Sequence, residues 1–247
     1  MAFMTLHVRS NALDLNTTVN ILLPQDVKKN ERLKVLYLYH GYIGDHTDWT
    51  RYTSLERYAW AYRLAIVMPA VNNSYYMDTP TGMNYFTYVA KELPELMSNL
   101  FPISDKREDS YVCGLSMGGY GAFKVALTYP ERFSKAASLS GALDIEEIRR
   151  LANEQPRNVW FNSVFGVKPT QGTPIDLRHL VQLHLSHFVK LPELFMGCGT
   201  EDFLYQDNVK FHDFLNQKGV QHTYMESPGV HDWAFWDAYI QKVLAWL

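Results

Sequence analysis

The chain has 247 residues, of which 47% are hydrophobic and 20% charged, and its formal net charge is −3. This is an ordinary globular composition with enough apolar residues for a sizeable core, and its scattered basic residues form neither a nucleic-acid footprint nor a polybasic membrane patch. No apolar run approaches transmembrane length, and Met1–His7 lacks the basic and apolar regions of a signal peptide, so we expect a cytoplasmic protein without membrane or nucleic-acid partners.

The pattern of apolar residues predicts strands that alternate with helices. In chain order, the predicted strands are Phe3–Val8, Thr17–Leu23, Leu33–Tyr39, Ala65–Met68, Tyr111–Cys113, Ala136–Leu139, Leu191–Met196 and Gln221–Glu226. The predicted helices are Phe86–Leu100, with a kink or a new turn at Pro94, Ala122–Tyr129, Asp207–Lys218 and Asp232–Leu247. This alternation predicts an α/β fold in one domain over residues 1–247, with a mostly parallel sheet and helices on both faces. Cys113 and Cys198 fall in apolar strand-like contexts, which indicates buried free thiols.

Residues 141–190 separate two predicted core strands and have the least regular pattern. Ile145–Asn153 predicts a short helix, and the aromatic stretch 159–165 follows it. So long an excursion is either a small cap over a site or a packed insertion. We expect a cap, because insertions over the C-terminal edge of a sheet usually shape substrate pockets.

The most informative segment is Tyr111–Gly121, which contains Gly114-x-Ser116-x-Gly118 between a strand-like and a helix-like run. In this setting a serine can occupy a sharp strand-to-helix turn with its hydroxyl exposed. Glycine is needed two residues to either side because side chains there would collide across so tight a bend. Ser116 is therefore the predicted nucleophile.

A serine hydroxyl needs a base to accept its proton, and a histidine base needs a carboxylate that fixes its tautomer. In this architecture the acid follows the serine on a loop after a late strand. Asp202 meets this requirement, because it closes a Gly-rich turn after Leu191–Met196. Glu201 and Asp207 are the competing candidates, and Asp202 is preferred for its position at the end of the strand.

His231 is the predicted base among nine histidines. It follows the strand Gln221–Glu226, Gly229 lets the loop turn sharply before it, and a helix begins after it, whereas His222 lies inside the strand. Both His231 and the acid should therefore emerge at the sheet edge that carries the serine. Three further histidines in the excursion are His179, His184 and His187. They lack a neighbouring carboxylate or cysteine, so no metal site is expected.

The tetrahedral intermediate of an acyl transfer also needs hydrogen-bond donors for its oxyanion. The N–H of Met117, directly after the nucleophile, is the first candidate. The second should come from the loop His40–Gly44, which follows a buried strand and contains glycine for close backbone approach. The sequence leaves open whether this donor is Tyr42 or Gly41.

The chain carries an oxyanion loop, then the turn around Ser116 (the nucleophile elbow), then the acid and then the base. In this it resembles the α/β-hydrolases, and within them the esterase D group. This group comprises tributyrin-esterase-like carboxylesterases and their relatives, the S-formylglutathione hydrolases and the feruloyl or acetylxylan esterases. The resemblance covers nearly the whole chain and rests on His40–Gly44 with His46–Trp49, on Cys113–Gly121, on Gly199–Asp202 and on His231–Trp233. It implies an α/β-hydrolase fold with Ser116 as nucleophile, His231 as base, Asp202 as orienting acid, and Tyr42 and Met117 as oxyanion donors.

The tributyrin-esterase-like branch is the closer likeness. It implies hydrolysis of short-chain acyl esters, from acetyl to butyryl and including acetyl groups on sugars, through an acyl-enzyme and without a cofactor or metal. S-formylglutathione hydrolases carry Ser-Gly-Leu followed by Thr-Cys where this chain has its His-Gly loop. Their thioester activity and the hydrolysis of feruloyl or acetylxylan esters remain alternatives, as do an acyltransferase and a non-catalytic binding scaffold. Relatives of this group often form homodimers or homotetramers, which makes either assembly an expectation by analogy.

Aromatic side chains near the site are candidates for the walls of a small pocket. The predicted substrate-binding residues are Trp49, Tyr76, Trp160 and Trp233. For any one of them, a position in the core is equally compatible with the sequence.

Overall fold

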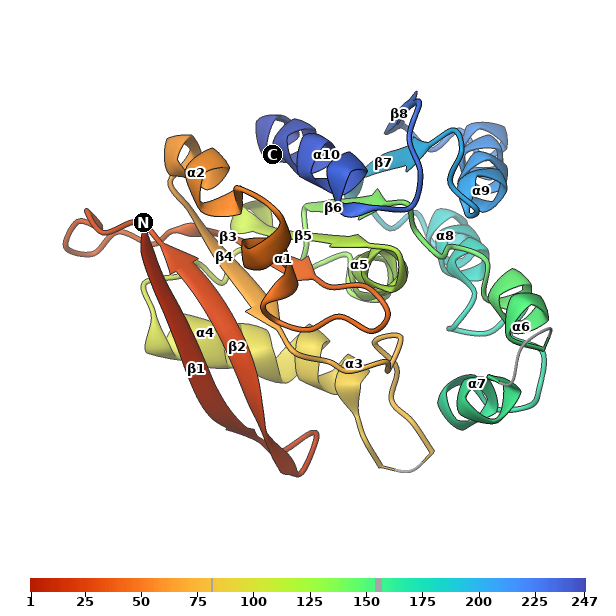
Figure 1. Cartoon of the computed structure of the whole chain (residues 1–247), viewed down its shortest axis with the longest axis horizontal. Coiled ribbons are helices and arrows are strands. Elements are labelled where there is room, and N and C mark those ends of the chain that lie inside the picture. The colour runs from red at the N-terminus through yellow and green to blue at the C-terminus, as the bar shows by residue number, and fades with distance from the viewer. Residues whose placement is uncertain (81, 154–156) are drawn as a thin grey trace.

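The computed structural model describes residues 1–80, 82–153 and 157–247, and an eight-stranded sheet lies at its centre (Figure 1). The strands are β1 (Ala2–Ser10), β2 (Leu15–Leu23), β3 (Lys34–Tyr39), β4 (Leu64–Pro69), β5 (Ser110–Leu115), β6 (Lys135–Leu139), β7 (Glu193–Gly199) and β8 (His222–Ser227). They lie in the order β1-β2-β4-β3-β5-β6-β7-β8. β1 pairs with β2 and β2 with β4 in antiparallel fashion, and all other neighbours in this order are parallel. The predicted mostly parallel sheet is confirmed.

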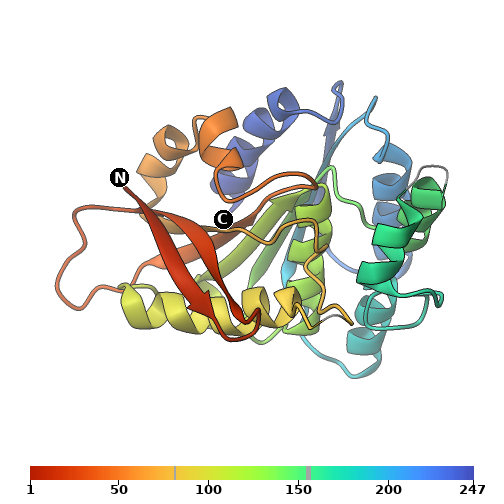
Figure 2. The ribbon, with the colours of Figure 1, turned by 60° about the horizontal axis from the view of Figure 1, so that its bottom comes forward.

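Helices cover both faces of the sheet. They are α1 (Asp48–Tyr52), α2 (Leu55–Ala59), the 3-10 turn η1 (Trp60–Tyr62), α3 (Tyr85–Thr87), the π turn η2 (Tyr88–Glu92), α4 (Leu93–Leu100), the 3-10 turn η3 (Arg107–Asp109), α5 (Met117–Thr128), α6 (Ile145–Asn153), α7 (Asn158–Phe165), α8 (Leu177–Ser186), α9 (Tyr205–Gln217) and α10 (Trp233–Trp246). In Figure 2, α1, α2 and α10 lie above the sheet, α3 and α4 lie below it, and α5 stands upright beside the strands.

The two helical layers explain why the predicted core strands are apolar throughout. Side chains alternate between the faces of a strand. In β3, Val35, Tyr37 and Tyr39 belong to the core cluster that contains residues of α4 and α5, whereas Leu36 and Leu38 belong to the cluster with residues of α1, α2 and α10. The strand is therefore buried from both sides, as its composition predicts.

The predicted helix Phe86–Leu100 contains a π turn just before Pro94. Within η2 the helix widens, and the N–H of Leu93 donates to the carbonyl of Tyr88, five residues earlier. Proline lacks an N–H, and its ring clashes with the carbonyl four residues before it. A wider turn at this point relieves that clash, which is the form that the expected irregularity at Pro94 takes.

The excursion 141–190 contains three helices, α6, α7 and α8, within its described residues. The predicted helix at Ile145–Asn153 is found, whereas α8 was not predicted. Figures 1 and 2 show α6 and α7 beside the sheet, beyond α5. Cys113 in β5 and Cys198 in β7 are buried free thiols, as predicted. In the described part of the chain, no helix has both the length and the apolar character that crossing a membrane requires.

Candidate active site

Ser116 occupies the sharp turn between β5 and α5. Its backbone has φ +53° and ψ −117°, a conformation that is uncommon for a residue with a side chain. A Cβ added at Gly114 would lie 2.2 Å from the carbonyl oxygen of Gly118, and one added at Gly118 would lie 2.6 Å from the carbonyl oxygen of His40. Both positions must therefore be glycine. The N–H of Ser116 donates to Leu139 O of β6 at 2.9 Å, which ties the turn to the neighbouring strand.

The structure brings the three predicted catalytic side chains together. His231 Nε2 lies 2.9 Å from Ser116 Oγ, and His231 Nδ1 lies 2.8 Å and 3.0 Å from the two carboxylate oxygens of Asp202. Asp202 follows β7 and His231 follows β8, so both come from the C-terminal edge of the sheet that also carries the elbow. An Nδ1–H that donates to Asp202 leaves Nε2 free to accept the proton of Ser116.

The surroundings of the acid and the base fix their geometry. The Asp202 side chain is fully buried, and its Oδ1 also accepts the N–H of Leu204 at 2.8 Å. The His231 ring packs against two aromatic rings, with its centroid 4.5 Å from that of Phe203 and 4.9 Å from that of Trp236. Trp236 is itself held by an indole N–H donated to Ser140 Oγ at 3.1 Å. The imidazole therefore has little freedom to turn away from the serine.

Glu201, the neighbouring candidate acid, binds the histidine loop instead of the histidine. Its carboxylate accepts the N–H of Gly229 at 2.5 Å, and its own N–H donates to Gly229 O at 3.0 Å. The hydrogen bond from Gly229 lowers the pKa of Glu201. Gly229 has φ +156°, and a Cβ there would lie 2.7 Å from the ring of Phe235. Glycine is thus required where the loop turns toward His231.

The other competing residues lie in different surroundings. Asp207 is buried in α9, and burial, with Asp144 and Glu147 nearby, raises its pKa to about 6. His222 shares a hydrogen bond with His212 at 2.7 Å and another with Val220 O. Neither Asp207 nor His222 has a recorded hydrogen bond to a triad residue in the described part of the chain.

Two of the three histidines of the excursion contact backbone carbonyls. His184 Nε2 lies 2.5 Å from Leu127 O, and His187 Nδ1 lies 2.8 Å from Leu183 O. Among the residues that the structure describes, no group of three or more His, Cys, Asp or Glu side chains is arranged to hold a metal ion.

The oxyanion loop packs directly against the nucleophile. A Cβ added at Gly41 would lie 2.6 Å from Leu115 Cδ1 and 3.6 Å from Ser116 Cβ. Met117 is the first residue of α5, where a backbone N–H has no partner within the helix. The N–H of Tyr42 also has no hydrogen bond to another described residue. The arrangement thus leaves free N–H groups next to Ser116.

His40 anchors this loop, a role that the sequence did not reveal. Its side chain is 1% exposed; Nδ1 donates to Gly41 O at 2.8 Å, and Nε2 accepts the N–H of Val71 at 3.1 Å. Burial lowers the pKa of His40 to about 4, so the ring is neutral at pH 7, as an Nε2 acceptor must be. His40 therefore fixes the loop through both ring nitrogens.

Two of the predicted substrate-binding residues lie in the core instead of the pocket. Trp49 is 1% exposed and donates its indole N–H to Tyr39 O at 3.0 Å, and Tyr76 is fully buried and donates its hydroxyl to His40 O at 2.9 Å. The prediction that Trp49 and Tyr76 contact substrate is corrected accordingly. Both side chains support the carbonyl groups at the start of the oxyanion loop.

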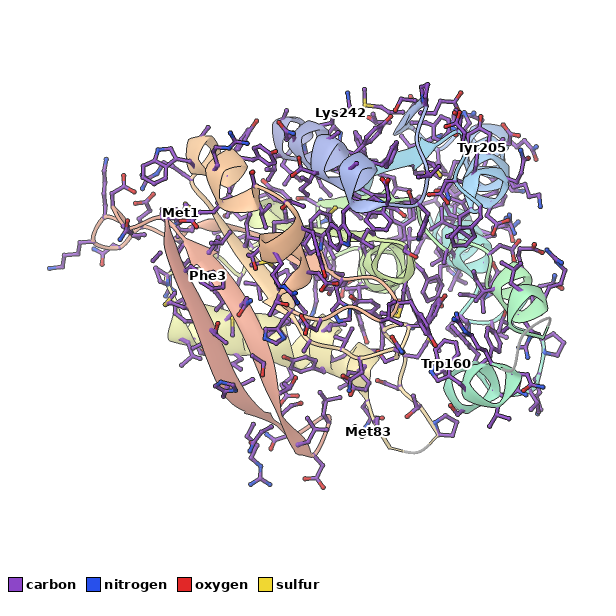
Figure 3. The ribbon with its side chains drawn as sticks, in the orientation of Figure 1. Met1, Phe3, Met83, Trp160, Tyr205 and Lys242 are labelled. Carbon is purple, nitrogen blue, oxygen red and sulfur yellow. The ribbon has the colours of Figure 1, made fainter. Side chains whose placement is uncertain are left out.

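A pocket of about 780 Å³ opens over Ser116 and His231. Trp160 and Trp233, the other two residues expected to bind substrate, line it, and so does Tyr75. Figure 3 shows Trp160 on α7, and its ring meets that of Tyr42 edge to face at 4.9 Å. The other lining residues are Gly41, Tyr42, Ile43, Gly44, Asp48, Tyr52, Leu115, Ala142, Ile148, Leu151, Ala152, Arg157, Phe203, Leu204, Asp232 and Trp236. Residues of α6 and α7 thus form one wall, and the loops of the triad form another.

Comparison with known proteins agrees with this geometry. Residues 10–247 match the family described as "Putative esterase". An acetyl esterase of Caldicellulosiruptor saccharolyticus is 36% identical over 262 aligned residues, which cover 100% of this chain and 98% of the relative. The structure of FphF, a fluorophosphonate-binding serine hydrolase of Staphylococcus aureus, is 34% identical with a TM-score of 0.92 and covers 99% of this chain and 97% of FphF. FrmB, an S-formylglutathione hydrolase of the same organism, is 34% identical with a TM-score of 0.90 and covers 99% of this chain and 98% of FrmB.

These similarities extend over essentially the whole chain. The predicted α/β-hydrolase fold is confirmed by the two solved structures. The predicted activity class, hydrolysis of carboxylic esters by a serine enzyme, is confirmed by the family match and the relatives together.

Proposed function

We propose, from the premise that this chain belongs to the Putative esterase family, that it hydrolyses short-chain acyl esters with Ser116 as nucleophile, His231 as base and Asp202 as the acid that orients the base. The observation that carries the proposal is the unbroken series of hydrogen bonds from Ser116 Oγ through both nitrogens of His231 to Asp202. The acetyl esterase relative supports acetyl esters as the first substrates to test.

In the first half of the reaction, Ser116 Oγ attacks the ester carbonyl carbon while His231 Nε2 takes the hydroxyl proton. The carbonyl oxygen becomes an oxyanion. When the intermediate collapses, the bond from carbon to the alcohol oxygen breaks, and His231 Nε2 gives its proton to that oxygen. The acyl group stays on Ser116, and Asp202 stabilises the imidazolium in both steps.

In the second half, a water molecule replaces the alcohol. His231 Nε2 takes a proton from the water as it attacks the acyl carbon, and the bond to Ser116 Oγ then breaks. The proton returns to Ser116, which leaves a free carboxylic acid and the starting enzyme. No cofactor is needed for any of these transfers.

We assign the two hydrogen-bond donors to the oxyanion as the N–H of Met117 and an N–H of the loop that His40 anchors. The resemblance to the esterase D group makes Tyr42 the preferred second donor. Gly41 is the alternative, because neither N–H has a hydrogen bond to another described residue and Gly41 itself packs on Ser116. Removing one such donor typically lowers turnover by about 10²–10³.

We assign residues 141–190 the role of a cap over the acyl group, within a single domain 1–247. Ile148, Leu151 and Trp160 supply apolar side chains to the pocket, and Trp160 also packs on the ring of Tyr42. An apolar wall so near the nucleophile suits a short acyl chain, from acetyl to butyryl. Acetyl groups on sugars fall within this acyl range.

A thioester is the second candidate substrate, because one neighbour at 34% identity is an S-formylglutathione hydrolase. The reaction above applies unchanged with sulfur in place of the alcohol oxygen. We further propose a cytoplasmic location, since both cysteines are free thiols as in a reducing compartment, and a homodimer or homotetramer by analogy with relatives.

The test is intact-mass spectrometry after incubation with a small fluorophosphonate, followed by peptide mapping. One adduct on Ser116, absent from Ser116→Ala, is the expected result. A panel of p-nitrophenyl esters from acetate to octanoate, with S-formylglutathione beside it, then ranks the substrates. Labelling elsewhere in the folded protein, or turnover retained by Ser116→Ala, would remove Ser116 from the mechanism.

A further inference from the structure

Three large apolar side chains at the mouth of the pocket are exposed to solvent. They are Ile43, 84% exposed, Phe203, 67% exposed, and Tyr52, 48% exposed, and all three line the pocket that contains Ser116. Single exposed apolar residues are normal on a protein surface, but several that converge on one site mark a binding surface. We call these three residues the apolar collar.

Ile43 is held in a backbone conformation that does not suit it. Its φ is +63°, in the left-handed region that glycine and asparagine adopt at lower cost and that a β-branched residue rarely enters. Its N–H donates to Asn73 Oδ1 at 2.7 Å, which helps to hold the turn. Because the side chain is almost fully exposed, its burial contributes little stability that could offset the cost of this backbone conformation. Such strain at the edge of a catalytic site points to a contact made with a bound molecule.

Phe203 lies on the side of the pocket where the alcohol must leave. Its ring centroid lies 4.5 Å from that of His231, and His231 Nε2 must deliver its proton to the alcohol oxygen. The alcohol group is therefore adjacent to His231 when its bond breaks. Exposed groups beside His231 are the ones that the alcohol meets.

Tyr52 extends the same surface. Its ring stacks on Trp233, with centroids 5.0 Å apart, and Trp233 packs edge to face on Trp236, the residue that flanks His231. The charged residues that line the pocket are Asp48, Asp232 and Arg157, so its wall carries both signs of charge and does not single out an ionised alcohol group. Asp232 Oδ1 is already engaged by the N–H of Phe235 at the start of α10.

We propose that Ile43, Tyr52 and Phe203 bind the alcohol part of the ester and select uncharged apolar alcohols, aryl or alkyl, over polyhydroxylated ones. This inference rests on the proposed function, since it assigns a specificity surface to the same reaction. It differs from the expectation of a sugar ester, which would present a polar alcohol at the same place.

The test uses three acetates of primary alcohols that differ in the alcohol alone: ethyl acetate, 2-phenylethyl acetate and glycerol monoacetate. The kcat/KM of each covers the steps up to formation of the acyl-enzyme, so it reports the alcohol and not the shared deacylation. In the wild type, 2-phenylethyl acetate should be the best of the three substrates. In Ile43→Asn, the ratio of kcat/KM for 2-phenylethyl acetate to that for ethyl acetate should fall about tenfold.

Phe188 offers a matched control. It is also a large apolar residue at positive φ, +55°, and is 96% exposed, but it does not line the pocket. Asparagine relieves the same backbone strain at both positions, so Phe188→Asn should match Ile43→Asn in thermal stability while leaving the substrate ratio at the wild-type value. Phe203→Ser serves as a second collar variant and should lower the same ratio.

Each result decides the question. An unchanged ratio in both collar variants, or a wild-type preference for glycerol monoacetate, overturns the proposal while leaving the esterase function intact. An unchanged ratio together with dissociation of an oligomer in Ile43→Asn, seen by light scattering, would assign the collar to an interface between copies and also overturn it. If no ester is hydrolysed, the proposed function itself fails, and the collar proposal fails with it.

Discussion

The sharpest prediction concerns His40, the buried histidine that holds the oxyanion loop. We replace it by asparagine, which cannot titrate and cannot span both of its hydrogen bonds. At pH 7 the variant leaves the buried N–H of Val71 without its acceptor, which costs about 1–3 kcal/mol of unfolding free energy. The loop that carries Tyr42 also loses its anchor, so turnover should fall, by up to about 10²-fold if the donor is lost entirely.

The dependence on pH has a defined sign. The pKa of His40 is about 4 in the folded protein against 6.5 for an ordinary histidine, so the unfolded chain takes up a proton first as the pH falls. The stability that comes from keeping this ring neutral is complete above pH 6.5 and is lost between pH 6.5 and pH 4. A shift of about 2.5 pH units corresponds to roughly 3 kcal/mol. The unfolding free energies of wild type and variant should therefore converge on acidification and cross at about pH 5.

Urea unfolding, followed by the fluorescence of the six tryptophans, measures this directly at several pH values between 4 and 7. The control is His7→Asn, which removes an exposed histidine from β1 and should track the wild type. The informative quantity is the difference between wild type and His40→Asn at each pH. If that difference stays constant from pH 7 to pH 4, the assignment of His40 as a buried neutral anchor is refuted.

Two further substitutions separate the candidate acids. Asp202→Asn should lower kcat on a short-chain ester by about 10⁴, because the histidine is left in the wrong tautomer, and a variant that keeps a tenth of wild-type turnover would contradict this. Asp207→Asn should leave turnover unchanged and raise the unfolding free energy above pH 6 by ~1 kcal/mol. The pKa of this buried carboxyl is raised to about 6, so the stability of its protonated form is lost as the pH rises through that value. Stability is measured by urea unfolding at pH 7.5, and a loss of activity in Asp207→Asn would reassign the acid.

The elbow could be predicted from the sequence because the glycines that it requires lie at fixed offsets from the serine. Gly114 and Gly118 lie two residues from Ser116, and the collisions that a Cβ would meet there involve the turn itself and the adjoining strand end. Asp202 and His231 were predictable for a related reason. Parallel strands place the loops after β7 and β8 at one edge, so order along the chain implies proximity in space.

The pocket walls could not be predicted in this way. Tyr75 and Tyr76 are adjacent, both have positive φ and both are buried, yet only Tyr75 is among the residues that line the pocket. Trp49 lies in a helix of five residues. Such a helix is too short for the helical spacing of apolar residues to show which of its faces is buried. The role of His40 depends on a hydrogen bond from Val71, 31 residues away, and no sequence pattern predicts that contact.

The separation of Ser116 and His231 by 115 residues has a consequence during biosynthesis. At ribosomal rates of about 5–20 residues per second, the serine emerges roughly 6–23 s before its base is made. Through that interval the nascent chain carries an elbow whose hydroxyl has no proton acceptor. The incomplete chain should therefore not hydrolyse esters. Because His231 follows β8, a fluorophosphonate should react only with chains in which β8 has paired with β7.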